Sequence, residues 1–112
     1  MTKALEKIIG YAIHLAQPDR IILFGSLAED RCDVYSDVDL LIVSEQNYRK
    51  KEVERQISSF AKEYSLKADV LIHTRSEIEM ASLHPYSFLG SIIKGGRIVY
   101  EKDGQASSLE QI

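Results

Sequence analysis

Asp37 and Asp39 are the residues whose type and spacing most directly predict chemistry in this chain. They stand two apart at the start of the apolar run 40–43, whose composition is typical of a buried strand. Because side chains alternate along a strand, both carboxylates point to one face. Two carboxylates about 4 Å apart repel by roughly 4 kcal/mol at an effective dielectric near 20. A hard divalent cation that prefers oxygen ligands, magnesium above all, would remove that cost.

Gly25 and Ser26 form a second unusual element, at the end of the β-branched and aromatic run 21–24. A glycine lets the backbone turn sharply and approach a ligand, while Ser26 can cap the next turn and donate its hydroxyl. Backbone N–H groups exposed in such a turn suit a phosphate oxygen. The bend and the two carboxylates together predict a site that handles nucleotides.

Each of these features has a simpler explanation when it is taken alone. Gly25 and Ser26 are also compatible with an ordinary turn, and Asp37 and Asp39 with solvated residues at the entrance of a strand. The combination of all four in this order favours the functional interpretation.

The order and spacing of these residues carry a resemblance to a known family. Ten residues separate Ser26 from Asp37, and Ser36 comes directly before the first carboxylate. With an apolar strand on either side, this arrangement resembles the minimal nucleotidyltransferases of the superfamily related to DNA polymerase beta. The resemblance implies an α/β fold, a small mixed β-sheet with helices packed on it. It also implies that Gly25, Ser26 and Ser36 bind the nucleoside triphosphate, ATP.

The resemblance further implies a third carboxylate, on a strand beside the Asp-x-Asp pair. Asp69 is the only acidic residue of the strand-like run 67–73. We expect Asp37, Asp39 and Asp69 to be the catalytic residues and to bind Mg²⁺, with Asp69 also helping to deprotonate an acceptor hydroxyl. A surface aspartate at a strand end is the alternative for Asp69. An acid in an otherwise apolar strand is costly unless it is paired or bound to a metal. This cost favours the functional interpretation of Asp69 over the surface one.

The chain departs from the family pattern in the loop between the two motifs. Family members often carry an Arg directly after Gly-Ser and a Gly three residues further on, where this chain has Leu27 and Asp30, and Glu29 stands where a further basic residue is common. Extra acid beside an anion is unfavourable, so the hold on the triphosphate is weaker unless Arg31 or a bound metal compensates.

Length and composition restrict the class of protein. With 112 residues, 45% hydrophobic and 28% charged, we expect one globular domain over residues 1–101 and a flexible tail over 102–112. A net charge of −3 gives no electrostatic case for binding nucleic acid. Cys32 is the single cysteine, and the sequence shows neither a signal peptide nor an apolar run long enough to span a membrane. These features predict a cytoplasmic protein.

The remaining periodic segments predict helices over residues 2–16, 47–64, 76–83 and 84–94, and strands over 67–73 and 97–100. Ser76 is the expected N-cap of the third helix, and Pro85 occupies a favoured first position in the fourth. Gly95 and Gly96 are expected to end that fourth helix.

The acceptor must be presented by something else, since larger relatives add a helical domain for it and this chain has no room for one. Stand-alone minimal members resemble antitoxins encoded with an HEPN-domain ribonuclease. That resemblance implies transfer of AMP from ATP to a hydroxyl of the HEPN toxin, a tyrosine in particular. Two alternatives stay open: a binding module that neutralises its partner by docking alone, and a small-molecule transferase acting as a homodimer. Leu27, Glu29 and Asp30 favour the first, and the short chain disfavours the second. Homo- and hetero-oligomers both remain possible.

Overall fold

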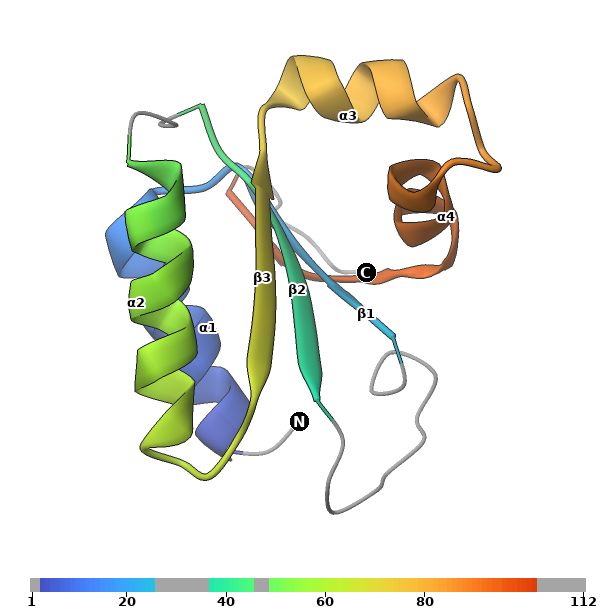
Figure 1. Cartoon of the computed structure of the whole chain (residues 1–112). Coiled ribbons are helices and arrows are strands. Elements are labelled where there is room, and N and C mark those ends of the chain that lie inside the picture. The colour runs from blue at the N-terminus through green and yellow to red at the C-terminus, as the bar shows by residue number, and fades with distance from the viewer. Residues whose placement is uncertain (1–2, 26–36, 46–48, 103–112) are drawn as a thin grey trace.

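A computed structural model describes residues 3–25, 37–45 and 49–102, and it has the mixed α/β architecture expected from the sequence (Figure 1). The elements follow in the order α1 (Lys3–Ala16), β1 (Arg20–Phe24), β2 (Val38–Val43), α2 (Lys50–Lys62), β3 (Ala68–His73), α3 (Arg75–Ser82), α4 (Phe88–Gly95) and β4 (Arg97–Glu101). No helix in these ranges has the length and apolar character needed to cross a bilayer.

The strands form one four-stranded sheet in the order β3-β2-β1-β4. β1 runs antiparallel to both β2 and β4, whereas β2 and β3 are parallel. The expectation of a small mixed sheet with helices packed on it is therefore confirmed. The parallel pair requires a long crossover connection, and α2 provides it.

Each face of the sheet has its own pair of helices (Figure 1). On one face α1 and α2 cover the main apolar core, which takes alternate residues of the strands, including Leu23, Leu40 and Val70. On the other face α3 and α4 cover a smaller cluster built on Ile22, Leu41 and Ile92. We call the second one the α3–α4 face. Asp37 and Asp39 share the strand alternation of Leu41 and therefore belong to this less covered face.

The outer edge of β3 is protected by polar side chains of α2. The Glu54 carboxylate accepts a hydrogen bond from the Ile72 N–H (3.2 Å), and the Ser58 hydroxyl donates to the Ala68 carbonyl (2.8 Å). An edge strand with free backbone groups is a template for aggregation. These two contacts satisfy part of that edge and fix the position of α2 on it.

The starts of three helices differ from the sequence expectation. α3 is capped by Thr74 rather than Ser76: the Thr74 hydroxyl accepts from the Glu77 N–H, and the Glu77 side chain accepts from the Thr74 N–H. The two hydrogen bonds satisfy two backbone N–H groups that the helix itself leaves without an acceptor, whereas the side chain of Ser76 alone could satisfy only one. α4 starts at Phe88 behind Ser87, since the preceding residues form a turn, so Pro85 lies outside the helix.

α2 is shorter than expected at both ends, Lys50–Lys62 instead of 47–64, and residues 46–48 lie outside the described part of the chain. The strand expected at 97–100 is confirmed as β4, and Gly96 caps the end of α4. The expectations for Ser26, for the loop 27–36 with Ser36, and for the tail beyond Lys102 also fall outside the described residues.

Candidate functional site

Asp39 lies at the centre of the candidate site because of its place in the sheet. On β2 it pairs with Phe24 of β1 on one side and with Asp69 of β3 on the other. Paired residues on neighbouring strands point to the same face, and the strands lie about 4.8 Å apart. The sheet therefore brings Asp39 and Asp69 side by side, although 29 residues separate them in the sequence.

Asp37 stands directly before β2 and belongs to the same face by alternation. All three carboxylates occupy the end of the sheet at which β2 and β3 begin, whereas α3 follows the opposite end of β3 (Figure 1). Asp69 is exposed, and Asp37 and Asp39 are partly buried. The arrangement leaves the carboxylates open to a ligand from the α3–α4 face.

The environment of Asp39 raises its pKa above the ordinary value for an aspartate. Burial is the largest cause, followed by the negative charges of Asp69 and Asp37 and by a hydrogen bond between the side chains of Asp39 and Asp69. The positive charge of Lys67 acts in the opposite direction. Three carboxylates thus lie close together at this end of the sheet, an arrangement that favours a bound cation.

Gly25 forms the wall of the site next to Asp39. Its φ of +79° lies in the left-handed region that favours glycine, and a Cβ at this position would collide with the Asp39 carboxylate, its Cγ lying only 3.2 Å away. The chain therefore turns with its bare backbone against the central acid. A side chain here would separate that backbone from any ligand of Asp39.

The donor atoms suit magnesium, since all of them are carboxylate oxygens and hard divalent cations prefer oxygen. Within the three described ranges, no three His, Cys, Asp or Glu side chains are already arranged closely enough to hold a metal ion. Asp39 and Asp69 do meet through their hydrogen bond, and Asp37 acts on Asp39 through its charge. The fit to magnesium rests on this donor chemistry and on the excess of negative charge.

Lys67 is the residue near the site that sequence reasoning missed. The Val38 N–H donates to its carbonyl (2.8 Å), which continues the β2–β3 ladder by one step. The signal was available in the sequence, because Lys67 precedes Asp69 by two residues and alternation places both on one face.

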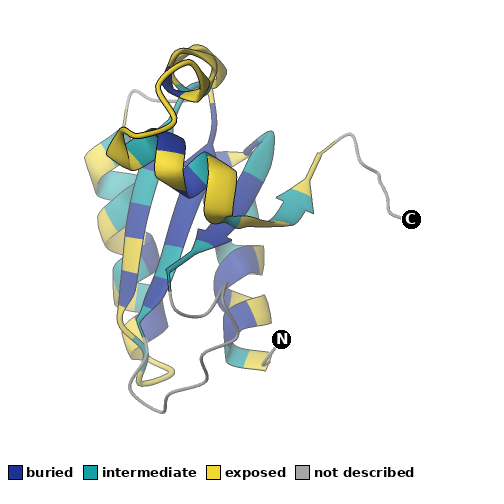
Figure 2. Ribbon diagram, turned by 90° about the vertical axis from the view of Figure 1, so that its right-hand side faces the viewer, coloured by how far each residue is buried: buried dark blue, intermediate teal, exposed yellow. Residues whose placement is uncertain are grey.

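Aromatic residues extend the site towards α4. The ring of Phe24, opposite Asp39 in the register, packs edge-on against the ring of Phe88, with 6.4 Å between centroids. Phe88 belongs to a group of exposed large apolar side chains on α3, α4 and their connection, where Figure 2 shows most of the chain as exposed. We call this group the α3–α4 patch, and its members are Met80 (61% exposed), Leu83 (70%), Tyr86 (98%) and Phe88 (69%).

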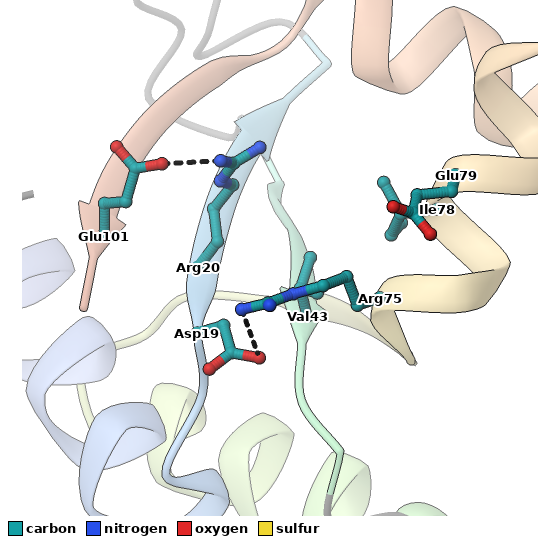
Figure 3. Close-up of a pocket in the computed structure, with 7 residues that line it drawn as sticks. All are labelled: Asp19, Arg20, Val43, Arg75, Ile78, Glu79 and Glu101. Atoms are coloured by element: carbon teal, nitrogen blue, oxygen red, sulfur yellow. Dashed lines mark hydrogen bonds and ion pairs between the residues drawn. The ribbon is translucent and has the colours of Figure 1, made fainter. Parts of the chain in front are cut away.

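A pocket of about 300 Å³ lies at the other end of the sheet, away from the carboxylates. Two ion pairs line it, Arg20 with Glu101 (2.5 Å) and Arg75 with Asp19 (3.3 Å), as Figure 3 shows. Both guanidinium groups are thus already paired with carboxylates. The candidate functional site remains at Asp39, where the three carboxylates gather and where the described residues show no such ion pair.

Comparison with known proteins shows the family and supports the fold. The family model described as "Polymerase beta, Nucleotidyltransferase" matches residues 6–105. A crystal structure described as "Crystal structure of the toxin-antitoxin with AMP-PNP" superposes with a TM-score of 0.57, covering 89% of this chain and 76% of the other at 15% sequence identity. At that identity the superposition supports the fold alone.

Two relatives in Methanocaldococcus jannaschii share part of the sequence. "Putative protein adenylyltransferase MJ1305" is 29% identical over 89 residues, which are 74% of this chain and 58% of the relative. "Putative protein adenylyltransferase MJ0141" is 48% identical over 54 residues, which are 48% of this chain and 54% of the relative. The matches thus span little more than half the length of either relative.

Proposed function

Since this chain belongs to the polymerase beta nucleotidyltransferase family, we propose that it transfers AMP from ATP to a hydroxyl group of a partner protein. The observation that carries the proposal is the pairing of Asp39 with Asp69 on one open sheet face, beside the glycine bend at Gly25. We further propose that residues 1–101 form one nucleotidyltransferase unit.

In the proposed reaction, the acceptor oxygen bonds to the α-phosphorus of ATP and the bond from that phosphorus to the bridging oxygen of the β-phosphate breaks. Pyrophosphate leaves, and the acceptor proton passes to a carboxylate. An unassisted hydroxyl is a poor nucleophile at neutral pH, with a pKa near 10 even for tyrosine, so it needs a base close by. Asp69 is the exposed member of the pair and is assigned this role.

The other residues hold the nucleotide. Asp37, Asp39 and Asp69 would hold Mg²⁺, which when bound supplies neutralisation of the phosphate charge. The bare backbone at Gly25 lets the phosphates approach Asp39 closely. Ser26 and Ser36 are proposed as further nucleotide contacts, from the sequence motif alone.

A protein acceptor is supported by two observations. Both relatives carry the name "Putative protein adenylyltransferase". The α3–α4 patch begins at Phe88, whose ring contacts Phe24 beside Asp39, so a protein seated on the patch has its surface next to the carboxylates. Monomers seldom expose contiguous apolar patches larger than a few hundred Å², and patches beyond that size mark interaction sites.

We propose an HEPN-domain toxin as this partner and a tyrosine as the modified residue, with the chain acting as antitoxin. The structural neighbour described as a toxin–antitoxin with AMP-PNP supports the pairing of such a fold with a toxin and a nucleotide. The alternative is a module that neutralises its partner by docking alone. The acidic loop residues Glu29 and Asp30 favour that alternative.

The test is incubation of the chain with a purified HEPN-domain protein, Mg²⁺ and labelled ATP, followed by mass spectrometry of that protein. We expect an added mass of one or more AMP units, located on a tyrosine. The Asp39→Asn variant should lose at least about 100-fold of this activity, because the central carboxylate is removed. Partner binding without any added mass would establish the docking module instead. Modification of a small molecule in the absence of a protein acceptor would establish a small-molecule nucleotidyltransferase.

A further inference from the structure

Lys67 directly precedes β3 and lies two residues before Asp69, as Asp37 directly precedes β2 and lies two residues before Asp39. Val38 pairs with Ala68 and Asp39 with Asp69 in the parallel register, and the Val38 N–H donates to the Lys67 carbonyl (2.8 Å), which holds the Lys67 backbone beside the start of β2. Since alternate residues share a face, the exposed Lys67 side chain leaves the strand on the side of Asp69. Its charge acts on Asp39 from there.

The proposed substrate needs such a cation. A triphosphate is strongly anionic, and it must approach a site in which three carboxylates already concentrate negative charge. Arg20 and Arg75 cannot serve, because their ion pairs hold them at the opposite end of the sheet.

We propose that Lys67 binds the phosphate chain of the nucleotide. This inference rests on the proposed function, because it assigns a further binding residue to the same site. A lysine suits the role, since its ammonium is a compact charge with three donors on a flexible stem. Lys67 thereby becomes a determinant of phosphate recognition, whereas Asp37, Asp39 and Asp69 remain the groups next to the reacting atoms.

The experiment compares Lys67→Gln, Lys67→Arg and a matched control, Lys102→Gln, in the full chain. Lys102 is also exposed, and its N–H donates to the Asp19 carbonyl at the far end of the sheet. The readouts are the dissociation constants for ATP with Mg²⁺ and for adenosine, both measured by ligand NMR, together with KM and kcat of the transfer. The melting temperature of the nucleotide-free protein reports on folding.

We expect Lys67→Gln to weaken ATP binding and to raise KM by about tenfold, with little change in adenosine binding or in kcat, because one charge-assisted contact to phosphate is lost. Lys67→Arg should restore most of the affinity, and Lys102→Gln should behave as wild type. Unchanged ATP binding in Lys67→Gln would overturn the inference. An equal loss for ATP and adenosine would also overturn it, since Lys67 would then only support the local structure.

The two proposals fail in different ways. A wild-type chain that transfers AMP while Lys67→Gln is unaffected leaves the proposed function intact and removes only the role of Lys67. A wild-type chain that binds ATP through Lys67 but transfers nothing keeps the role of Lys67 and removes the transferase. Absence of ATP binding by the wild type would overturn both.

Discussion

Asp39 and Asp69 lie opposite each other on the parallel strands β2 and β3, and the neighbouring carboxyl of Asp69 helps to raise the pKa of Asp39. Two neighbouring carboxyl groups can share a hydrogen bond only when one of them carries a proton. Burial and the charge of Asp69 both raise the pKa of Asp39, so the Asp39 carboxyl retains its proton to higher pH than an isolated aspartate does. The nucleotide-free site is therefore strained electrostatically in its fully ionised form.

The first prediction concerns the titration of this pair. In the nucleotide-free protein, carbon NMR should give Asp39 a pKa above the ordinary value of about 3.9. In Asp69→Asn the pKa of Asp39 should fall, because the second negative charge is absent, but burial should keep it above that ordinary value. An Asp39 carboxyl that titrates identically in both proteins would contradict the electrostatic coupling.

The second prediction follows from linkage between this pKa and stability. A carboxyl whose pKa is raised on folding stabilises the folded state below its unfolded pKa, and this contribution is lost as pH rises through the folded pKa. Asp39→Asn removes the charge while retaining the size of the side chain. We therefore expect it to raise the melting temperature of the nucleotide-free protein at pH 7 relative to wild type, with the gain shrinking towards pH 3.

The same Asp39→Asn variant should lose transfer activity by about 100-fold or more, so stability and function move in opposite directions. Thermal unfolding at pH 3, 5 and 7 without nucleotide measures the first effect. A variant less stable than wild type at pH 7 would indicate that the ionised Asp39 is favourably paired in the folded protein.

The sequence could predict the face on which the acids lie but not the order of the strands. Alternation places Asp37 and Asp39 together because it follows from the geometry of any extended chain. The position of β1 between β2 and β4 depends instead on pairings between segments far apart in the sequence, such as Arg20 with Glu101, which local alternation does not specify. The closeness of Asp39 and Asp69 depends on parallel pairing and could be expected only from the family resemblance.

Helix starts were less predictable because neighbouring residues compete for the cap. Thr74, Ser76 and Ser87 can all accept a backbone hydrogen bond, and the choice depends on which of them adopts an extended conformation. The spacing of Thr74 and Glu77 is a capping-box pattern and could have been recognised. Pro85 suits a first turn, but the chain first turns between His84 and Ser87.

The third prediction uses two glycines as a matched pair. Gly25→Ala should destabilise the protein by about 1–3 kcal/mol, because alanine is strained at φ +79° and its Cβ meets the Asp39 carboxylate. Transfer activity should fall as Asp39 is displaced. Gly10→Ala should instead stabilise the protein by about 0.5–1 kcal/mol, since Gly10 lies inside α1 with open space around its Cβ position. Urea unfolding of both variants measures the contrast, and similar effects would refute the tight approach at Gly25.

The fourth prediction concerns the protected edge of the sheet. Glu54→Ala removes the acceptor of the Ile72 N–H on β3, and we expect a loss of about 1–3 kcal/mol in the free energy of unfolding. The freed edge should also promote self-association, which light scattering would detect. Glu63→Ala, at an exposed position after the same helix, is the control and should stay within about 0.5 kcal/mol of wild type. Equal behaviour of the two variants would show that the side-chain contact contributes nothing to the edge.

The fifth prediction separates partner binding from nucleotide binding. Leu83 and Tyr86 are exposed members of the α3–α4 patch, and neither contributes to the buried clusters on the two faces of the sheet. The double variant Leu83→Ser, Tyr86→Ser should therefore keep the wild-type melting temperature and ATP affinity. Its affinity for the HEPN partner should fall by at least about tenfold, since two large apolar side chains leave the interface, and AMP transfer should fall in parallel at low partner concentration.

The control for this variant is Tyr64→Ser, which removes an aromatic side chain from the opposite face, where Tyr64 packs against Phe60 of α2. Calorimetry with the purified partner measures affinity, and transfer at saturating partner concentration tests whether the site itself is intact. Recovery of full activity at saturation would locate the defect in docking. Wild-type affinity of the Leu83→Ser, Tyr86→Ser variant would exclude the patch as the surface on which the acceptor protein binds, and the partner would then have to reach Asp69 from another side.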